Sequence, residues 1–210
     1  MFNLKNYILS LNHIKNDDGT ITILEDVKVS HNELHTLNTD LKIKEVKGNF
    51  DCSYNLLTDL IGSPQIVDGN FYAYSNNLES LIGSPKKVGI TFSVSNNFIE
   101  NLIESPIEVG KDFFVYSNRL TNLANSPEII HGTYDCHDNN LITLSGATIN
   151  IQSKFKYHDN INLKQREIDA YYDYVLNLNP SLWRKYKSLL SIALLEKYNH
   201  LDSASNFNMI

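Results

Sequence analysis

The chain has 210 residues, of which 42% are apolar and 20% charged, and its formal net charge at pH 7 is −6. This composition predicts a globular protein of one or two domains, and the negative balance disfavours a general binder of nucleic acid or anionic membranes. No apolar run approaches the roughly 18 residues of a membrane-spanning helix. The first residues lack the basic start and long apolar core of a signal peptide, so we expect a cytoplasmic protein.

Near the N-terminus, an apolar stripe at helical spacing is followed by a turn and a short apolar run. The stripe predicts a helix over residues 3–15 and consists of Leu4, Tyr7, Ile8, Leu11 and Ile14. Residues 17–20 have the composition of a turn, and residues 21–24 are expected to form a strand. We therefore predict an N-terminal cap over residues 1–24.

From residue 25 to residue 154 the sequence repeats with a period of 21 residues. Similar residues recur in register: aromatic residues at Phe50, Phe71, Phe92, Phe113 and Tyr134; asparagines at Asn55, Asn76, Asn97, Asn118 and Asn139; aliphatic residues at Leu57, Leu78, Ile99, Leu120 and Leu141; and prolines at Pro64, Pro85, Pro106 and Pro127. An earlier unit that contains Asn32 follows the same pattern but is two residues longer, since Asn32 precedes Asn55 by 23 residues. A fixed period in this range is typical of a solenoid, whose units bury one another's apolar sides.

Each unit begins with an alternating segment that predicts a β-strand. Phe71 and Ala73 lie two residues apart, so both side chains should point inward, and strands of successive units should pair in parallel. The asparagine after each strand carries two donors and an acceptor, and we expect it to be buried and bonded to turn backbone. The Ser-Pro half of the unit has no helical spacing and is expected to be extended. The corner before the next strand should use Gly69, Gly89, Gly110 and Gly132.

These in-register columns resemble the leucine-rich repeat family, and the short unit with its proline is most similar to repeats of bacterial effectors and bacteriophage proteins. The resemblance implies an α/β leucine-rich-repeat solenoid with a parallel concave β-sheet and an extended convex side without regular helices.

After Leu144 the register fades, and the composition then changes towards helices. Ile149 and Ile151 are predicted to form a last strand with no asparagine behind it. A first helix is expected from Leu163 to about Leu178, capped by Asn162, and a second from Pro180 to about Tyr198. We interpret residues 155–210 as a helical hairpin that caps the C-terminal end of the solenoid.

The sequence offers little that predicts catalysis or a cofactor. Cys52 and Cys136 occupy inward positions four units apart, roughly 19 Å, which is beyond disulfide reach. We expect both to be buried thiols. The densest polar cluster includes Asp135, His137 and Asp138, but a nucleophile pair of Cys136 with His137 is disfavoured because strand alternation places them on opposite faces. We therefore predict a protein that is not an enzyme and needs no cofactor or metal.

The outward strand positions are the best candidate for a binding site. They mix aromatic, hydroxyl and acidic residues, and exposed aromatic residues suit the centre of a protein interface. Tyr72 and Tyr74 are expected to flank a shallow trough together with Phe114 and Tyr116. The predicted partner-binding residues are Asp51, Tyr72, Tyr74, Ser93, Ser95, Asp112, Phe114, Tyr116, Asp135 and His137. The acidic members favour a partner protein with a basic patch.

Three alternatives remain at this point. A carbohydrate-binding solenoid would use the tyrosines as a stacking platform. A metal-dependent enzyme would use Asp135, His137 and Asp138, and a purely structural scaffold would bind nothing on this face. The sequence does not indicate the oligomeric state.

Overall fold

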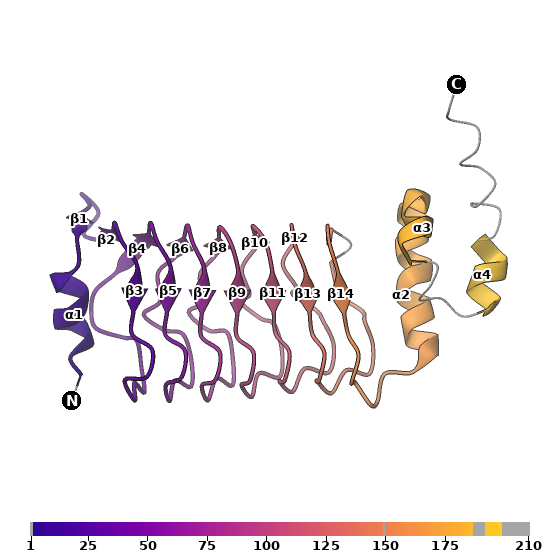
Figure 1. Ribbon diagram of the computed structural model, residues 1–210, viewed down its shortest axis with the longest axis horizontal. Coiled ribbons are helices and arrows are strands. Elements are labelled where there is room, and N and C mark those ends of the chain that lie inside the picture. Colours follow the sequence, from indigo (N-terminus) through magenta and orange to yellow (C-terminus); the bar gives the residue numbers. More distant parts are fainter. Residues whose placement is uncertain (1, 149, 187–191, 199–210) are drawn as a thin grey trace, which may run out of the picture.

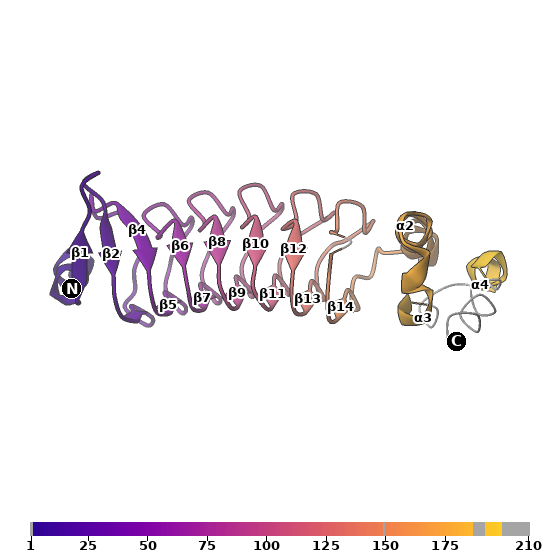
Figure 2. The same cartoon turned by 90° about the horizontal axis from the view of Figure 1, so that it is seen from above.

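The computed structural model describes residues 2–148, 150–186 and 192–198. Helix α1 covers one end of a stack of coils, and α2 covers the other (Figure 1). The helices are α1 (Leu4–Ser10), α2 (Gln165–Leu178), α3 (Trp183–Tyr186) and α4 (Ile192–Tyr198), with a 3-10 turn at Pro180–Leu182. The coil stack runs along a nearly straight line when the molecule is turned (Figure 2).

Strands of successive coils form two parallel sheets, so the chain is a β-solenoid. The front sheet contains β3 (Val27–Lys28), β5 (Phe50–Asp51), β7 (Phe71–Tyr72), β9 (Phe92–Ser93), β11 (Phe113–Phe114), β13 (Tyr134–Asp135) and β14 (Phe155–Lys156). Its register follows the sequence repeat, because Phe71 pairs with Phe92 and Phe92 with Phe113. The predicted parallel pairing is therefore confirmed.

The other side of each coil forms a back sheet, which the sequence predicted only as extended backbone. It contains β1 (His13–Lys15), β2 (Ile21–Ile23), β4 (Ile43–Val46), β6 (Ile66–Val67), β8 (Lys87–Val88), β10 (Glu108–Val109) and β12 (Ile129–Ile130). The segment after each proline is extended and retains free N–H groups, so it can pair with the previous coil; Lys86 N donates to Gln65 O at 2.8 Å. The expectation of no regular helix on this side is confirmed.

Aromatic rings stacked between the two sheets fill the core. The rings of Phe50, Phe71, Phe92 and Phe113 are fully or almost fully buried, with successive centroids 5.4 to 5.5 Å apart and nearly parallel planes. The aliphatic columns of the repeat are buried beside them. Each coil thus completes the apolar surface of its neighbour, as expected of a solenoid.

The asparagine column forms a buried ladder along the corner after the front sheet. In a typical coil, Asn97 Nδ2 donates to the carbonyl groups of Ala73 and Val94 at 3.1 and 3.0 Å, and its Oδ1 accepts from Leu78 N at 2.9 Å. Because these partners lie in two successive coils, one side chain satisfies the corner of its own coil and ties it to the preceding coil. The predicted burial and bonding of this column are confirmed.

Two corners of each coil use left-handed backbone, but not at the glycines that the sequence suggested. One corner lies at Gly62, Gly83, Glu104, Asn125 and Gly146, and the other directly precedes the asparagine ladder, at Tyr54, Ser75, Asn96, Ser117, Asp138 and Asp159. The glycines assigned to the corner before the strand have no positive φ. They are needed for space instead, since a Cβ on Gly110 would lie 1.9 Å from the carbonyl oxygen of Gly89 in the preceding coil.

The N-terminal cap contains a shorter helix than predicted. Helix α1 ends at Ser10, and residues 13–15 form β1, which pairs antiparallel with β2. Asn16 and Gly19 close the connecting turn, where Asn16 N donates to Thr20 O at 2.9 Å and Gly19 has a φ of 78°. The prediction failed because Ile14 matched the helical spacing, whereas its side chain is exposed on the edge strand.

The solenoid continues for one further strand beyond the predicted end. Strand β14 pairs with β13, and Asn160 extends the ladder by accepting from Leu141 N at 3.0 Å, so the prediction that no asparagine follows is wrong. Ile151 forms a single parallel bridge with Ile130, and Ile149 lies outside the described residues. This extra turn was missed because, although Phe155 and Asn160 keep the 21-residue register, Thr148 replaces the proline before them and Asn162 and Gln165 replace the leucines after them.

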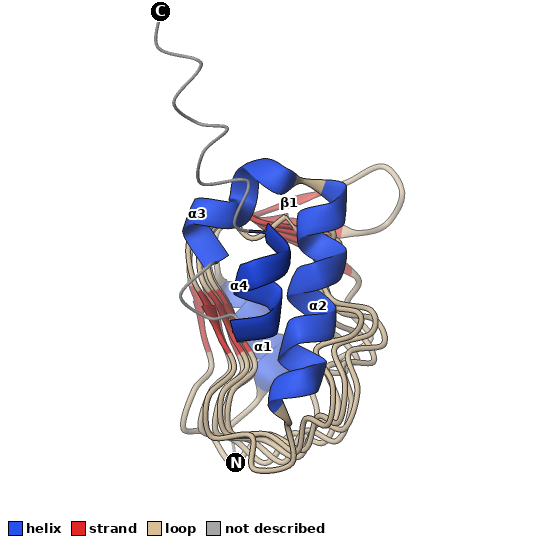
Figure 3. Ribbon diagram, turned by 90° about the vertical axis from the view of Figure 1, so that its right-hand side faces the viewer, coloured by secondary structure: helices blue, strands red, loops and turns tan. Residues whose placement is uncertain are grey.

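Helix α2 packs across the open end of this last turn, as Figure 3 shows along the stack. Its buried face consists of Tyr171, Tyr172, Val175 and Leu176. The Tyr171 ring meets that of Phe155 at 5.6 Å. The helix begins later than expected, with Lys164 rather than Asn162 at the N-cap position. The second predicted helix is divided into a 3-10 turn, α3 and α4, and residues 187–191 of that prediction lie outside the described part of the chain.

Candidate functional site

The outward face of the front sheet contains all ten residues that the sequence assigned to partner binding, but they differ in exposure. Tyr72, Tyr74, Phe114 and Tyr116 are half-buried, whereas their immediate neighbours along the strand, such as Phe71 and Ala73, point into the core. Asp51, Asp112 and His137 are also half-buried. Three assignments need correction as direct contact residues, because Ser93, Ser95 and Asp135 have relative exposures of only 5%, 0% and 3%. Small serine side chains between bulky neighbours leave little surface of their own.

The aromatic residues of this face form two clusters separated by the serine coil of Ser93 and Ser95. Cluster one contains His31, Tyr54, Tyr72 and Tyr74; the ring centroids of Tyr54 and Tyr74 are 5.2 Å apart. Cluster two contains Phe114, Tyr116, His137 and His158; Tyr116 stacks on His137 at 4.7 Å, and His137 on His158 at 4.6 Å.

Sequence reasoning missed three members of these clusters. His158 follows His137 by 21 residues, and His31 precedes Tyr54 by 23, the offset that also separates Asn32 from Asn55. Extending the repeat register towards the C-terminus would have found His158. Tyr54 and His31 both lie in the left-handed corner column, and only the three-dimensional structure shows that this column reaches the same face.

The carboxylates of the face are engaged within the protein. Asp51 accepts from the Ser53 N–H at 3.0 Å, and Asp112 accepts from the Thr133 N–H at 2.8 Å. Asp135 is held by the His137 ring at 2.5 Å and by Lys156 Nζ at 3.0 Å. Within the predicted acidic flank, the negative charge of Asp135 is therefore largely neutralised by its contacts with His137 and Lys156. The face is mainly aromatic in character.

The Asp135 carboxyl has a pKa below its ordinary value. Burial alone would raise the pKa, but hydrogen bonds from His137 and Lys156 to the charged form outweigh that effect. A depressed folded-state pKa means that the charged carboxylate stabilises the fold above the unfolded pKa of about 3.9. This contribution is lost as the pH falls through the folded-state value.

Asp135→Asn is expected to lower the free energy of unfolding at pH 7 by about 1–3 kcal/mol, because charge-assisted hydrogen bonds are lost. The difference from the unmodified chain should shrink as the pH is lowered below about 4. Urea unfolding monitored by circular dichroism at several pH values measures both effects. Asp138→Asn is the control, since this exposed carboxylate bonds Ser117 Oγ at 2.8 Å. A gap that stays constant from neutral to acidic pH would contradict the role given to Asp135.

The outward face of the back sheet has a different chemistry. Its exposed positions include charged residues that pair with one another across coils, such as Lys47 with Asp68 at 3.3 Å and Lys87 with Glu108 at 3.2 Å. Mutually compensated surface charges of this kind are satisfied by one another and by water. The two faces of the solenoid therefore differ, and the aromatic clusters distinguish the front sheet.

The residues considered for catalysis lie in structural environments. Cys52 and Cys136 are buried free thiols, and burial raises the pKa of both. Such a shift disfavours the reactive thiolate. Within the described residues, no group of three or more His, Cys, Asp or Glu side chains is arranged to hold a metal ion. Asp138 bonds Ser117 Oγ at 2.8 Å and takes no part in the contact between Asp135 and His137.

Comparison with known proteins gives no family assignment. No family model, curated protein or solved structure matches this chain. In the part of the chain that the structure describes, no helix is long and apolar enough to cross a membrane. The chain is thus defined by its fold, a repetitive solenoid with turns of about 21 residues.

Proposed function

We propose that the protein is a non-catalytic recognition module that binds a partner protein on the outward face of the front sheet. The observation that supports this most directly is the pair of aromatic clusters on one rigid face. Tyrosine and phenylalanine provide large contact areas with few rotatable bonds, and they are enriched at the centres of protein interfaces. The parallel ladder beneath them fixes their spacing before any partner arrives.

The biological setting of this proposal rests on the resemblance of the repeat to leucine-rich repeats of bacterial effectors and bacteriophage proteins. By that resemblance the protein is a cytoplasmic modulator of a host protein. The aromatic face and the engaged carboxylates favour a partner surface with apolar groups at its centre. A basic patch on the partner would meet Asp51 and Asp112 at the edge, where charge affects the association rate more than the affinity.

The double variant Tyr74→Ala and Phe114→Ala is expected to weaken partner binding by roughly thirtyfold or more, because each cluster loses one of its aromatic rings. The partner is first captured from the producing or infected cell, then purified, and its dissociation constant is measured by calorimetry. The control variant, Ile107→Ala with Ile129→Ala, removes two exposed apolar side chains of the back-sheet side. Both variants must melt at the temperature of the unmodified chain.

Unchanged affinity in the folded double variant would place the binding surface elsewhere and overturn the proposal. The tyrosines could instead serve as a stacking platform for a carbohydrate. A glycan array distinguishes this possibility. Saturable glycan binding by the unmodified chain that disappears in the same double variant would identify the ligand of this face as a saccharide and not a protein.

A further inference from the structure

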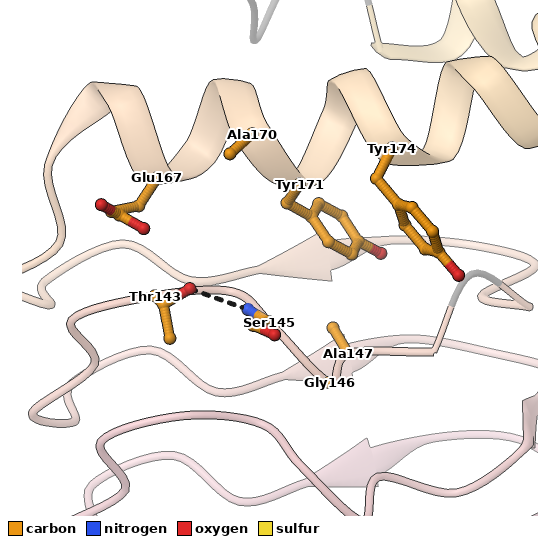
Figure 4. Close-up of a pocket in the computed structure, with 8 residues that line it drawn as sticks. All are labelled: Thr143, Ser145, Gly146, Ala147, Glu167, Ala170, Tyr171 and Tyr174. Atoms are coloured by element: carbon orange, nitrogen blue, oxygen red, sulfur yellow. Dashed lines mark hydrogen bonds between the residues drawn. The ribbon is translucent and has the colours of Figure 1, made fainter.

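A cavity lies between the last full coil and helix α2. It has a volume of about 390 Å³ and is bounded below by Thr143, Ser145 and Ala147 and above by α2 (Figure 4). The cavity exists because the chain does not form another complete coil at this point: it leaves Asn160 and enters α2, which crosses the end of the stack. It shares no residue with the two aromatic clusters of the front sheet.

The α2 side chains that line this cavity differ from one end to the other. Glu167 lies at one end, Tyr174 at the other, and Ala170 and Tyr171 lie between them (Figure 4). Tyr171 is fixed in place by its hydroxyl group, which donates to Thr148 O at 3.1 Å. Two tyrosine rings over small residues form an apolar space with room for a side chain, and the carboxylate of Glu167 closes it with a negative charge.

A second cavity of about 380 Å³ continues the first beyond Glu167. Thr143 and Glu167 line both cavities, and the second adds the basic residues Lys164 and Arg166. Arg166 Nε contacts Glu167 Oε1 at 3.1 Å, so these opposite charges lie side by side. Along the groove the order is therefore two cations, one carboxylate and then the apolar space between the tyrosines.

We propose that this groove binds an α-amino acid with an aromatic or large aliphatic side chain. The carboxylate of such a ligand would face Lys164 and Arg166, its ammonium group would face Glu167, and its side chain would enter the space beside Tyr171 and Tyr174. The carboxylate, the ammonium group and the side chain of an α-amino acid are all attached to one carbon atom, so the ligand can present them together to cations, a carboxylate and an apolar space that lie close to one another. Charge-assisted hydrogen bonds at both ionic groups would fix its orientation.

Two simpler ligand types match the groove less well. Arg166 and Glu167 are paired with each other in the protein, so a ligand with a single charge that engages one of them leaves the other without its partner. A zwitterion supplies a replacement partner for both. An unpaired charge beside a bound apolar group costs binding free energy because the charge loses water without gaining a partner. The zwitterion is therefore the species for which every charged group of the groove has a use.

Isothermal titration of the full chain with L-phenylalanine, phenethylamine and 3-phenylpropanoate tests this proposal. These compounds share the phenyl ring and differ in the charged groups. L-phenylalanine is expected to bind saturably, and each analogue with one charge at least about tenfold more weakly, a difference of about 1.4 kcal/mol. Glu167→Gln should weaken the amino acid about tenfold and leave 3-phenylpropanoate unchanged or bound more tightly. Glu100→Gln, which changes an exposed glutamate in the middle of the solenoid, should leave all three affinities unchanged.

Equal affinities for the three compounds would show that the charged residues of the groove do not contribute to ligand binding, and would overturn the proposal. So would the absence of saturation up to about 10 mM L-phenylalanine, or an unchanged affinity in Glu167→Gln. Folding of this variant is verified by its melting temperature, and Tyr174→Ala provides a second test, because it alters an exposed ring and should weaken L-phenylalanine while sparing the fold. Retained full affinity in Tyr174→Ala would also count against the site.

Discussion

Asn97→Ala is expected to lower the free energy of unfolding by about 3 kcal/mol, because it leaves several buried backbone groups without hydrogen-bond partners. The Asn97 amide oxygen accepts from the N–H groups of Asn76 and Leu78, at 3.2 and 2.9 Å, and its amino group donates to carbonyl groups of two successive coils. A methyl group cannot replace any of these bonds, and the site, which is 5% exposed, admits little water.

Urea unfolding monitored by circular dichroism measures this change. Asn140→Ala is the matched control, because Asn140 directly follows the ladder residue Asn139 but is exposed, and its loss should change stability by no more than about 0.5 kcal/mol. Equal stabilities of the Asn97 and Asn140 variants would show that the ladder does not hold the coils together.

Removal of residues 164–210 is expected to convert the protein from a soluble species into aggregates. The chain would then end three residues after the ladder residue Asn160, and the edge of the front sheet at strand β14 would lose the helix that covers it. The rings of Phe155 and Tyr157 would also lose the cover of α2, where they contact Tyr171 and Tyr172 at 5.6 and 6.4 Å. Solenoids depend on such terminal caps for solubility.

Size-exclusion chromatography with light scattering measures this effect. A chain shortened only to Tyr198 retains α2, α3 and α4 and serves as the control, which should elute as the unmodified chain does. A soluble, monomeric 1–163 fragment with the β-sheet spectrum of the parent would show that the helices are dispensable for the solenoid.

The fold could be predicted from the sequence wherever the repeat itself carries the information. The same type of residue recurs at equivalent positions of successive coils, which shows the environment of each position several times. The inward positions of Phe71 and Ala73 and the burial of Asn76 could therefore be predicted from the sequence. The back sheet could not, because the proline before β6, β8, β10 and β12 signals extended backbone without specifying a pairing partner. The end of the stack was misplaced because the last turn keeps Phe155 and Asn160 but replaces the leucines with a connection to α2.

The candidate site was predictable in outline and not in detail. Alternation correctly assigned Tyr74 and Phe114 to the outward face, since period two decides the face of any strand residue. Alternation cannot tell how far a neighbour leans over a small side chain, and so it placed Ser95 in an open trough. The groove beside α2 was outside the reach of sequence reasoning, because it depends on how a helix crosses the end of the stack.

The repeating coils are evenly spaced, so distances along the front sheet change in whole multiples of one coil spacing. The two aromatic clusters are separated by the single serine coil of Ser93 and Ser95. Inserting or deleting one 21-residue unit would therefore change their separation by one coil spacing of about 4.8 Å. Such a change would leave the caps, the ladder and the inward columns in register. Evolution or design could therefore vary the distance between the two halves of the face in whole steps, with no intermediate values.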